Sequence, residues 1–331
     1  MTPRSPLDPI VGAEIARRTA TGADPTPGMP MPERRERALR VNTDLWRHAG
    51  SPGPATETSE WVVPVADVPE VRVRMHRPPG TPADRALPGV IALFGGAFRQ
   101  GGIDYPSFDA AVRSRCVGAG VAVIAVDYAL APEWPFPNAL EQVYAVLDQL
   151  ARQGAERGID PTRLAITGAS AGANLAAAAC LANRDRANHP LRLQLLEVPA
   201  VDLTGAQLDR SVITDLGGSV EAAEAGVSEV VAMYLAGADP TNPLASPLRA
   251  DSLAGLPPAY LMAAELDPLV GDAHAYAARL LAEGTPASLF VAAGQTHESN
   301  SFSGISLAAR HWEASVIAVL RTLHESPEAD R

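Results

Sequence analysis

The sequence predicts an α/β fold in which helices cover both faces of a mostly parallel sheet. From Trp61 onward, short apolar runs alternate with longer segments whose apolar residues recur at helical spacing. The middle runs are continuous and rich in Val and Ile, as expected of parallel strands that are buried on both faces. A third observation is the serine turn Gly168–Gly172, which joins one such run to an alanine-rich helical segment. This alternation favours one layered α/β domain.

The chain divides into an N-terminal arm, residues 1–58, and a main domain, residues 59–331. The arm holds two helical segments, 10–18 and 32–47, between stretches that carry Pro and Gly. Eight runs in the main domain predict strands, at residues 61–65, 71–76, 89–94, 121–126, 163–167, 191–198, 259–264 and 287–293. Helices are predicted at residues 108–117, 139–153, 172–183, 272–283 and 307–324. Residues 203–255 lack a strand signal and are interpreted, with the arm, as a cap on the catalytic edge.

Composition excludes several classes of function. The net charge of −11 argues against nucleic acid and anionic membrane as partners, because both require clustered Lys and Arg. The chain shows no signal peptide and no apolar run long enough to span a bilayer, so we expect a cytoplasmic protein without membrane insertion. Two cysteines, Cys116 and Cys180, lie in apolar helical segments and are expected to be buried thiols. No cofactor or metal is expected.

The motif Gly168-Ala169-Ser170-Ala171-Gly172 predicts a nucleophile. A strand precedes it and a helix follows, which is the context that gives the G-x-S-x-G pattern its meaning. The free N–H groups at the start of that helix point to where negative charge develops. A second loop of small residues, Gly95-Gly96-Ala97-Phe98, follows the strand 89–94 and can offer N–H groups to a carbonyl oxygen. A phosphate loop is excluded there because no Lys-Ser/Thr pair follows.

Chain order then predicts the acid and the base. Asp267 leaves the carboxyl end of the strand 259–264, and His297 lies in a glycine-containing loop after the last strand, giving the order Ser, Asp, His. Asp272 competes with Asp267 but is expected to cap the next helix. With His274 it could suggest a metal site, but no further ligands stand at workable spacing. In the expected mechanism His297 deprotonates Ser170 while Asp267 orients the imidazole.

From Trp61 to the C-terminus these motifs closely resemble those of the hormone-sensitive-lipase-like family of α/β hydrolases, the bacterial carboxylesterases. The resemblance rests on VDYALAPEWPFPNAL, GIDPTRLAITGASAGANLAAAA, LRLQLLEVPAVD and LAGLPPAYLMAAELDPLVGDAHAYAARL. It implies the α/β-hydrolase fold with an eight-stranded mixed sheet, a cap, and small-molecule esters with short to medium acyl chains as substrates. It also implies that Gly96, Ala97 and Ala171 donate their N–H groups to the oxyanion, and it leaves a homodimer open.

The chain departs from the family pattern at four positions. Phe94 replaces the usual His of the oxyanion loop and is expected to hold the loop by packing, and Ala169 replaces the usual Asp before the nucleophile. Glu298 replaces the usual Gly after the histidine and places a carboxylate where it can raise the pKa of His297. Glu197, at a position usually apolar or aromatic, is expected to be either a substrate contact or a solvated residue at the strand end. Phe98 and Glu298 are further candidate substrate contacts.

The departures leave three functions open. The first is a carboxylesterase, and the second is an amidase or a non-hydrolytic elimination or cyclisation on the same residues. The third is a non-catalytic binding protein, which the survival of Ser170, Asp267 and His297 disfavours.

Overall fold

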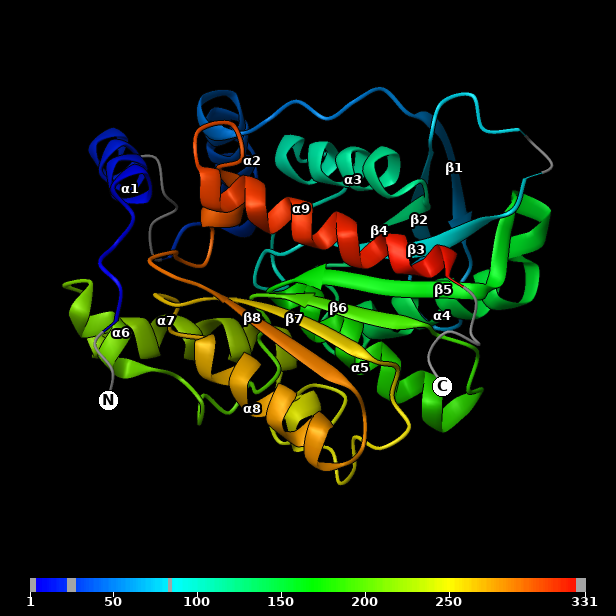
Figure 1. Cartoon of the computed structure of the whole chain (residues 1–331). Helices are drawn as coiled ribbons and strands as arrows, with labels where there is room; N and C mark the ends of the chain where they lie inside the picture. Colours follow the sequence, from blue (N-terminus) through cyan, green and yellow to red (C-terminus); the bar gives the residue numbers. More distant parts are fainter. Residues whose placement is uncertain (1–3, 23–27, 83–84, 326–331) are drawn as a thin grey trace.

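The computed structural model describes residues 4–22, 28–82 and 85–325, and one eight-stranded sheet runs through them (Figure 1). The strand order is β1-β2-β4-β3-β5-β6-β7-β8, with β1 and β2 antiparallel to their neighbours and all other pairs parallel. The predicted mostly parallel α/β sheet is thereby confirmed.

Each of the eight strands overlaps one of the eight predicted runs. They are β1 Glu57–Val63, β2 Val71–Arg77, β3 Leu87–Leu93, β4 Ala122–Asp127, β5 Ile159–Ala169, β6 Leu193–Glu197, β7 Ala259–Ala264 and β8 Ala287–Ala292. Strand β3 is buried at every position, as its continuous apolar sequence predicts, whereas β2 alternates between more and less buried residues. Strand β5 begins four residues before its predicted start, because Ile159 and Asp160 pair with the beginning of β3.

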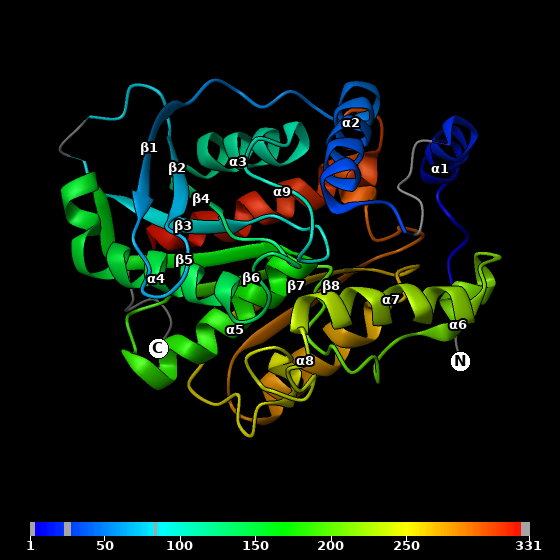
Figure 2. The ribbon, with the colours of Figure 1, turned by 180° about the vertical axis from the view of Figure 1, so that it is seen from behind.

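Five main-domain helices cover the two faces of the sheet (Figures 1 and 2). On one face lie α4 (Asn138–Gln153), α5 (Ala171–Arg186) and α8 (Val270–Ala282), whose buried residues form a single core with β3, β5 and β7. On the other face lie α3 (Pro106–Ala119) and α9 (Leu307–Arg321). The thiols Cys116 on α3 and Cys180 on α5 are both buried, as predicted. Short 3-10 turns complete the main domain at Gly154–Arg157, Pro247–Arg249, Ser299–Ser301 and Thr322–His324.

The arm and the insertion meet at one end of the sheet (Figures 1 and 2). The arm forms α1 (Pro9–Thr21) and α2 (Met31–Ala49), and the insertion forms α6 (Arg210–Asp215) and α7 (Val220–Leu235). An apolar cluster that includes Val11 and Leu45 packs the arm against Phe302, just beyond the histidine loop. Arg4 reaches across to Asp209 of the insertion at 2.6 Å. None of the helices within the described ranges is long and apolar enough to cross a bilayer.

Candidate active site

Ser170 lies in the tight turn between β5 and α5. Its φ of 55° and ψ of −116° are strained for a residue with a side chain. A Cβ at Gly168 would lie 2.3 Å from the carbonyl carbon of Gly172, and a Cβ at Gly172 would lie 2.4 Å from the carbonyl oxygen of Phe94. Both positions therefore require glycine, and the turn presents Ser170 at the carboxyl edge of the sheet.

Ser170, His297 and Asp267 form one hydrogen-bonded chain. His297 Nδ1 lies 2.6 Å from Asp267 Oδ2, and His297 Nε2 lies 2.9 Å from Ser170 Oγ. When Nδ1 carries the proton, Nε2 is free to accept the hydroxyl proton of the serine. Asp267 is 2% exposed, and its second oxygen accepts a hydrogen bond from the Leu269 N–H at 2.9 Å, which fixes the carboxylate. The structure thus brings together the three residues that chain order selected.

The surroundings of His297 favour its protonated form. Burial opposes protonation, but the charge of Asp267, the hydrogen bond to it, and the charge of Glu298 together raise the pKa of His297 above its ordinary value. An imidazolium formed during a reaction would be stabilised by the same groups.

The loop after β3 turns sharply beside Ser170. Gly96, Ala97 and Phe98 have φ values of 143°, 53° and 59°, so three consecutive residues have positive φ. A Cβ at Gly96 would lie 1.9 Å from the Gln100 carbonyl oxygen, so this position also requires glycine. Among the described residues, no acceptor is bonded to the backbone N–H groups of Gly96, Ala97 or Ala171. These donors are available to a ligand.

Aromatic packing holds this loop at Phe94. The ring is 2% exposed, stacks on Tyr128 with centroids 4.0 Å apart, and meets Phe108 edge-on at 5.9 Å. The Tyr128 hydroxyl also donates a hydrogen bond to the Phe94 carbonyl oxygen at 2.6 Å. A Cβ at Gly101 would lie 2.5 Å from the Phe94 ring, so the following turn must approach the ring closely. Phe94 therefore holds the loop by ring packing, as expected from the sequence, with a backbone hydrogen bond from Tyr128 in addition.

Comparison with known proteins identifies the family of this chain. A family model described as the alpha/beta hydrolase fold matches residues 90–300. Carboxylesterase NlhH of Mycobacterium tuberculosis is 32% identical over 331 aligned positions, which cover 97% of this chain and 98% of the relative. The chain belongs to the hormone-sensitive-lipase-like family of α/β hydrolases. An arylesterase of Saccharolobus solfataricus is 33% identical over 291 positions, covering 86% of this chain and 89% of its own. A hyperthermophilic esterase of Pyrobaculum calidifontis superimposes with a TM-score of 0.83 at 29% identity, over 96% of this chain and 99% of its own.

Glu197 of this hydrolase is buried and lines the cavity described below, which corrects the expectation of a solvated residue at the strand end. It is 1% exposed, and its two oxygens accept hydrogen bonds from Arg115 at 2.7 and 3.0 Å. The Trp312 indole N–H donates to it at 2.7 Å, and Glu313 binds the other side of the same guanidinium. We call Arg115, Glu197, Trp312 and Glu313 the anchor cluster. The Glu197 backbone oxygen accepts the N–H of Ser170 at 2.9 Å, so the cluster lies directly behind the nucleophile.

Glu298 links the histidine loop of the hydrolase to the N-terminal arm. Its carboxylate forms an ion pair with Arg18 on α1. Two further contacts come from Asp8, whose N–H donates to the Gly294 carbonyl at 3.0 Å and whose carboxylate accepts from the Gln295 amide at 3.0 Å. Sequence reasoning missed Arg18 and Asp8, because no local pattern relates them to a loop more than 270 residues away.

Two other expectations are corrected. Phe98 is 3% exposed and stacks on Tyr234 of α7 with centroids 3.8 Å apart, so its ring supports the insertion and does not line the cavity described below. Asp272 does not cap α8, because the helix begins two residues earlier, at Val270. Its buried carboxylate accepts the Asp202 N–H at 2.9 Å. Burial, above all, raises the pKa of Asp272 to about 7.

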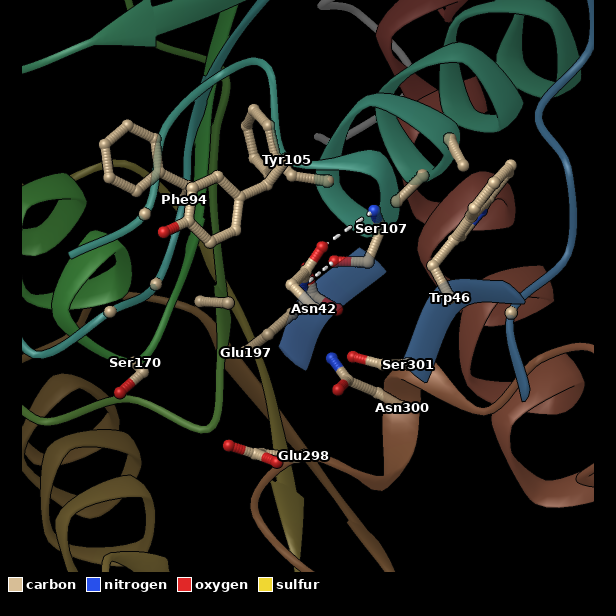
Figure 3. Close-up of a pocket in the computed structure, with 18 of the residues that line it drawn as sticks. Asn42, Trp46, Phe94, Tyr105, Ser107, Ser170, Glu197, Glu298, Asn300 and Ser301 are labelled. Carbon is tan, nitrogen blue, oxygen red and sulfur yellow. Dashed lines mark hydrogen bonds between the residues drawn. The ribbon is translucent and has the colours of Figure 1, made fainter. Parts of the chain in front are cut away.

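A cavity of about 900 Å³ opens beside Ser170. Its walls come from α2, α3, α9, the loop after β3 and the histidine loop, and Figure 3 shows Ser170, Glu197 and Glu298 around this space. Gly96, Ala97, Ser170 and His297 all contribute to the lining. Among the residues described, no three or more His, Cys, Asp or Glu side chains are grouped to hold a metal ion.

Proposed function

We propose that this chain is a serine carboxylesterase that hydrolyses esters of a small molecule, with Ser170 as nucleophile, His297 as base and Asp267 as orienting acid. The observation that carries the proposal is the hydrogen-bonded chain of these three side chains at the edge of the cavity. The names of the relatives, carboxylesterase and arylesterase, support the same reaction. Short to medium acyl chains are part of the proposal.

Each step of the proposed ester hydrolysis uses a side chain or a backbone N–H group described above. His297 Nε2 takes the hydroxyl proton as Ser170 Oγ attacks the ester carbonyl, and Asp267 stabilises the imidazolium. The N–H groups of Gly96, Ala97 and Ala171 stabilise the oxyanion. The C–O bond to the alcohol then breaks, and the alcohol oxygen takes the proton from Nε2. Water attacks the acyl-enzyme by the same route and releases the acid.

The arm, residues 1–58, and the insertion, residues 203–255, form the proposed cap. Both contact the loops that carry the reacting groups, through Arg18 and Asp8 from the arm and through Tyr234 from the insertion. A cytoplasmic location, which rests on the sequence, and a homodimer, which rests on the family resemblance, complete the proposal.

The test combines labelling with turnover. A fluorophosphonate probe should label the wild type and not Ser170→Ala, which should also hydrolyse p-nitrophenyl acetate and butyrate about 10⁴–10⁶-fold more slowly. A folded wild type that is not labelled would contradict the esterase proposal. Labelling without ester turnover would instead favour the amidase or non-hydrolytic alternative.

A further inference from the structure

The cavity beside Ser170 exists because small residues line part of the sheet. Ala92 on β3 and Thr167 on β5 are paired neighbours in the sheet, and Ala169 lies next to Glu197 on the adjoining strand. All four line the cavity, and with them lie the helical residues Phe108, Ala111, Ala314 and Ile317 of α3 and α9. Short side chains at these strand ends leave space under the two helices, so a substrate group can extend beyond the nucleophile.

Polar side chains stand on every wall of this space. They are Asn42 and Trp46 on α2, Gln100 and Tyr105 in the loop after β3, Ser107 and Ser114 on α3, Thr167 on β5, and Asn300 and Ser301 after the histidine. Figure 3 shows most of them around the cavity, with Asn42 and Ser107 joined by hydrogen bonds of 2.7 and 3.3 Å. The apolar part of the lining comes from α2, α3, α9 and the end of β3. The cavity is therefore amphipathic.

Three of these polar groups have a buried atom without a partner in the protein. The Trp46 Nε1 donor, the Gln100 Oε1 acceptor and the Thr167 hydroxyl each lack a hydrogen bond to any residue that the structure describes. Thr167 is only 1% exposed. A buried polar group that stays unpaired costs about 1–3 kcal/mol. Because all three residues line the cavity, a ligand or water that occupies it is the natural source of the missing bonds.

Charged side chains of both signs also line the cavity, and most are paired within the protein: Arg18 with Glu298, Arg34 and Arg99 with Glu229, and Arg115 with Glu197 and Glu313. Two carboxylates, Glu197 and Glu313, share the single guanidinium of Arg115, and the Glu313 side chain remains 21% exposed. A wall that offers both donors and acceptors suits hydroxyl groups, which can do both, whereas an alkyl chain would exclude water from the wall and replace no hydrogen bond.

We propose that the part of the ester that fills this cavity is a neutral ring bearing several hydroxyl groups, so that the enzyme prefers short-chain esters of polyhydroxylated alcohols over esters of alkyl alcohols of the same size. A ring of this kind presents hydroxyls to the polar side chains and CH groups to the apolar residues of α2, α3 and α9. A site that hydrogen-bonds a hydroxyl rejects the analogue that lacks it far more strongly than an apolar pocket rejects an extra methylene. This inference rests on the proposed esterase function and specifies its substrate class.

The test compares 6-O-acetylglucose with cyclohexylmethyl acetate, which share the ring, the CH₂ link and the acetyl group and differ in the ring oxygen and hydroxyls. The ratio of the two kcat/KM values should be about ten or more in the wild type, and Thr167→Val and Gln100→Met should each lower it about fivefold or more. Thr58→Val, on the exposed strand β1 outside the cavity, is the matched control and should keep the wild-type ratio. Taking the ratio within one enzyme cancels any general loss of activity.

The outcomes separate the two proposals. A ratio of one or less in an enzyme whose Ser170 is labelled by a fluorophosphonate would overturn the substrate class and leave the esterase function standing. A high ratio that neither cavity variant lowers would overturn the assignment to these walls. Absence of labelling and of all ester turnover would overturn both proposals together.

Discussion

Replacing Glu197 by Gln should lower both the stability of the protein and its kcat. The Glu197 side chain binds Arg115 and Trp312, and its backbone oxygen binds the N–H of Ser170. The carboxylate accepts three hydrogen bonds, two from Arg115 and one from the Trp312 indole. An amide of the same size can accept at one end only, so its NH₂ group must face Arg115 or Trp312, which are both donors. At least one buried donor is left unpaired, and the charge attraction is lost.

The stability change follows from these contacts. Removing one partner of a buried ion pair costs about 3–5 kcal/mol, but Arg115 keeps Glu313, so we expect about 2–4 kcal/mol. At an unfolding entropy of about 2 cal/mol/K per residue, this lowers the melting temperature of a chain of 331 residues by about 3–6 °C. Differential scanning calorimetry of the wild type and the variant measures this change in melting temperature.

The effect on activity has a different origin. The Glu197 backbone oxygen holds the Ser170 N–H at 2.9 Å, and the strained turn depends on this end of β6 staying in place. A displacement of about 1 Å at a reacting group can cost about 10²-fold in rate, so kcat should fall about 10–100-fold while KM changes little. Glu313→Gln is the matched control, since it removes a carboxylate from the same guanidinium on α9 and should reduce kcat less. An unchanged kcat and melting temperature in Glu197→Gln would refute the anchoring role.

Two further predictions concern pH. Because the negative charge of Glu298 helps to raise the pKa of His297, Glu298→Gln should move the acidic limb of the kcat/KM profile to lower pH, and an unmoved limb would exclude that coupling. Asp272 has a folded-state pKa of about 7, above its unfolded value of 3.8. Between these pH values the folded protein therefore binds more protons than the unfolded protein, and it loses stability as the pH rises through this window. In Asp272→Asn the side-chain oxygen can still accept the hydrogen bond from the Asp202 N–H, but the side chain does not titrate. The free energy of unfolding of this variant should exceed that of the wild type at pH 8, by at most about 4 kcal/mol, and should match it near pH 4. Equal denaturant curves for the two proteins at pH 8 would contradict this reasoning.

The sequence predicted most of the fold because the strands carry local signals. Buried parallel strands are continuous apolar runs, and each of the eight strands of the sheet overlaps a predicted run. The six-residue helix α6 escaped prediction because it is too short to show a helical period. Asp272 was assigned to a helix cap because its type and position suit one, but the helix extends two residues further toward the N-terminus. Element boundaries depend on tertiary contacts that a local pattern does not contain.

The residues of the site were also predictable only where they carry a local signal. Ser170, Asp267 and His297 could be selected because each follows a strand, and the carboxyl ends of parallel strands meet at one edge. The partners of Glu197 could not be selected, because Arg115 is 82 positions away on a helix where an arginine ordinarily faces solvent. Nothing in the sequence distinguishes a buried ion pair from two surface charges.

The pairing of β5 with β6 relates two departures from the family pattern, Ala169 and Glu197. Ala169 stands where the family usually carries Asp, and it is the direct partner of Glu197 in the pairing of β5 with β6. Paired residues of parallel strands project to the same side of the sheet, so an Asp at 169 would add a third carboxylate beside Glu197 and Glu313. Arg115 already binds both of these, and a further buried charge of the same sign would repel them. A carboxylate at position 197 therefore favours a neutral side chain at 169, and alanine, being small, also leaves space in the cavity beside the nucleophile.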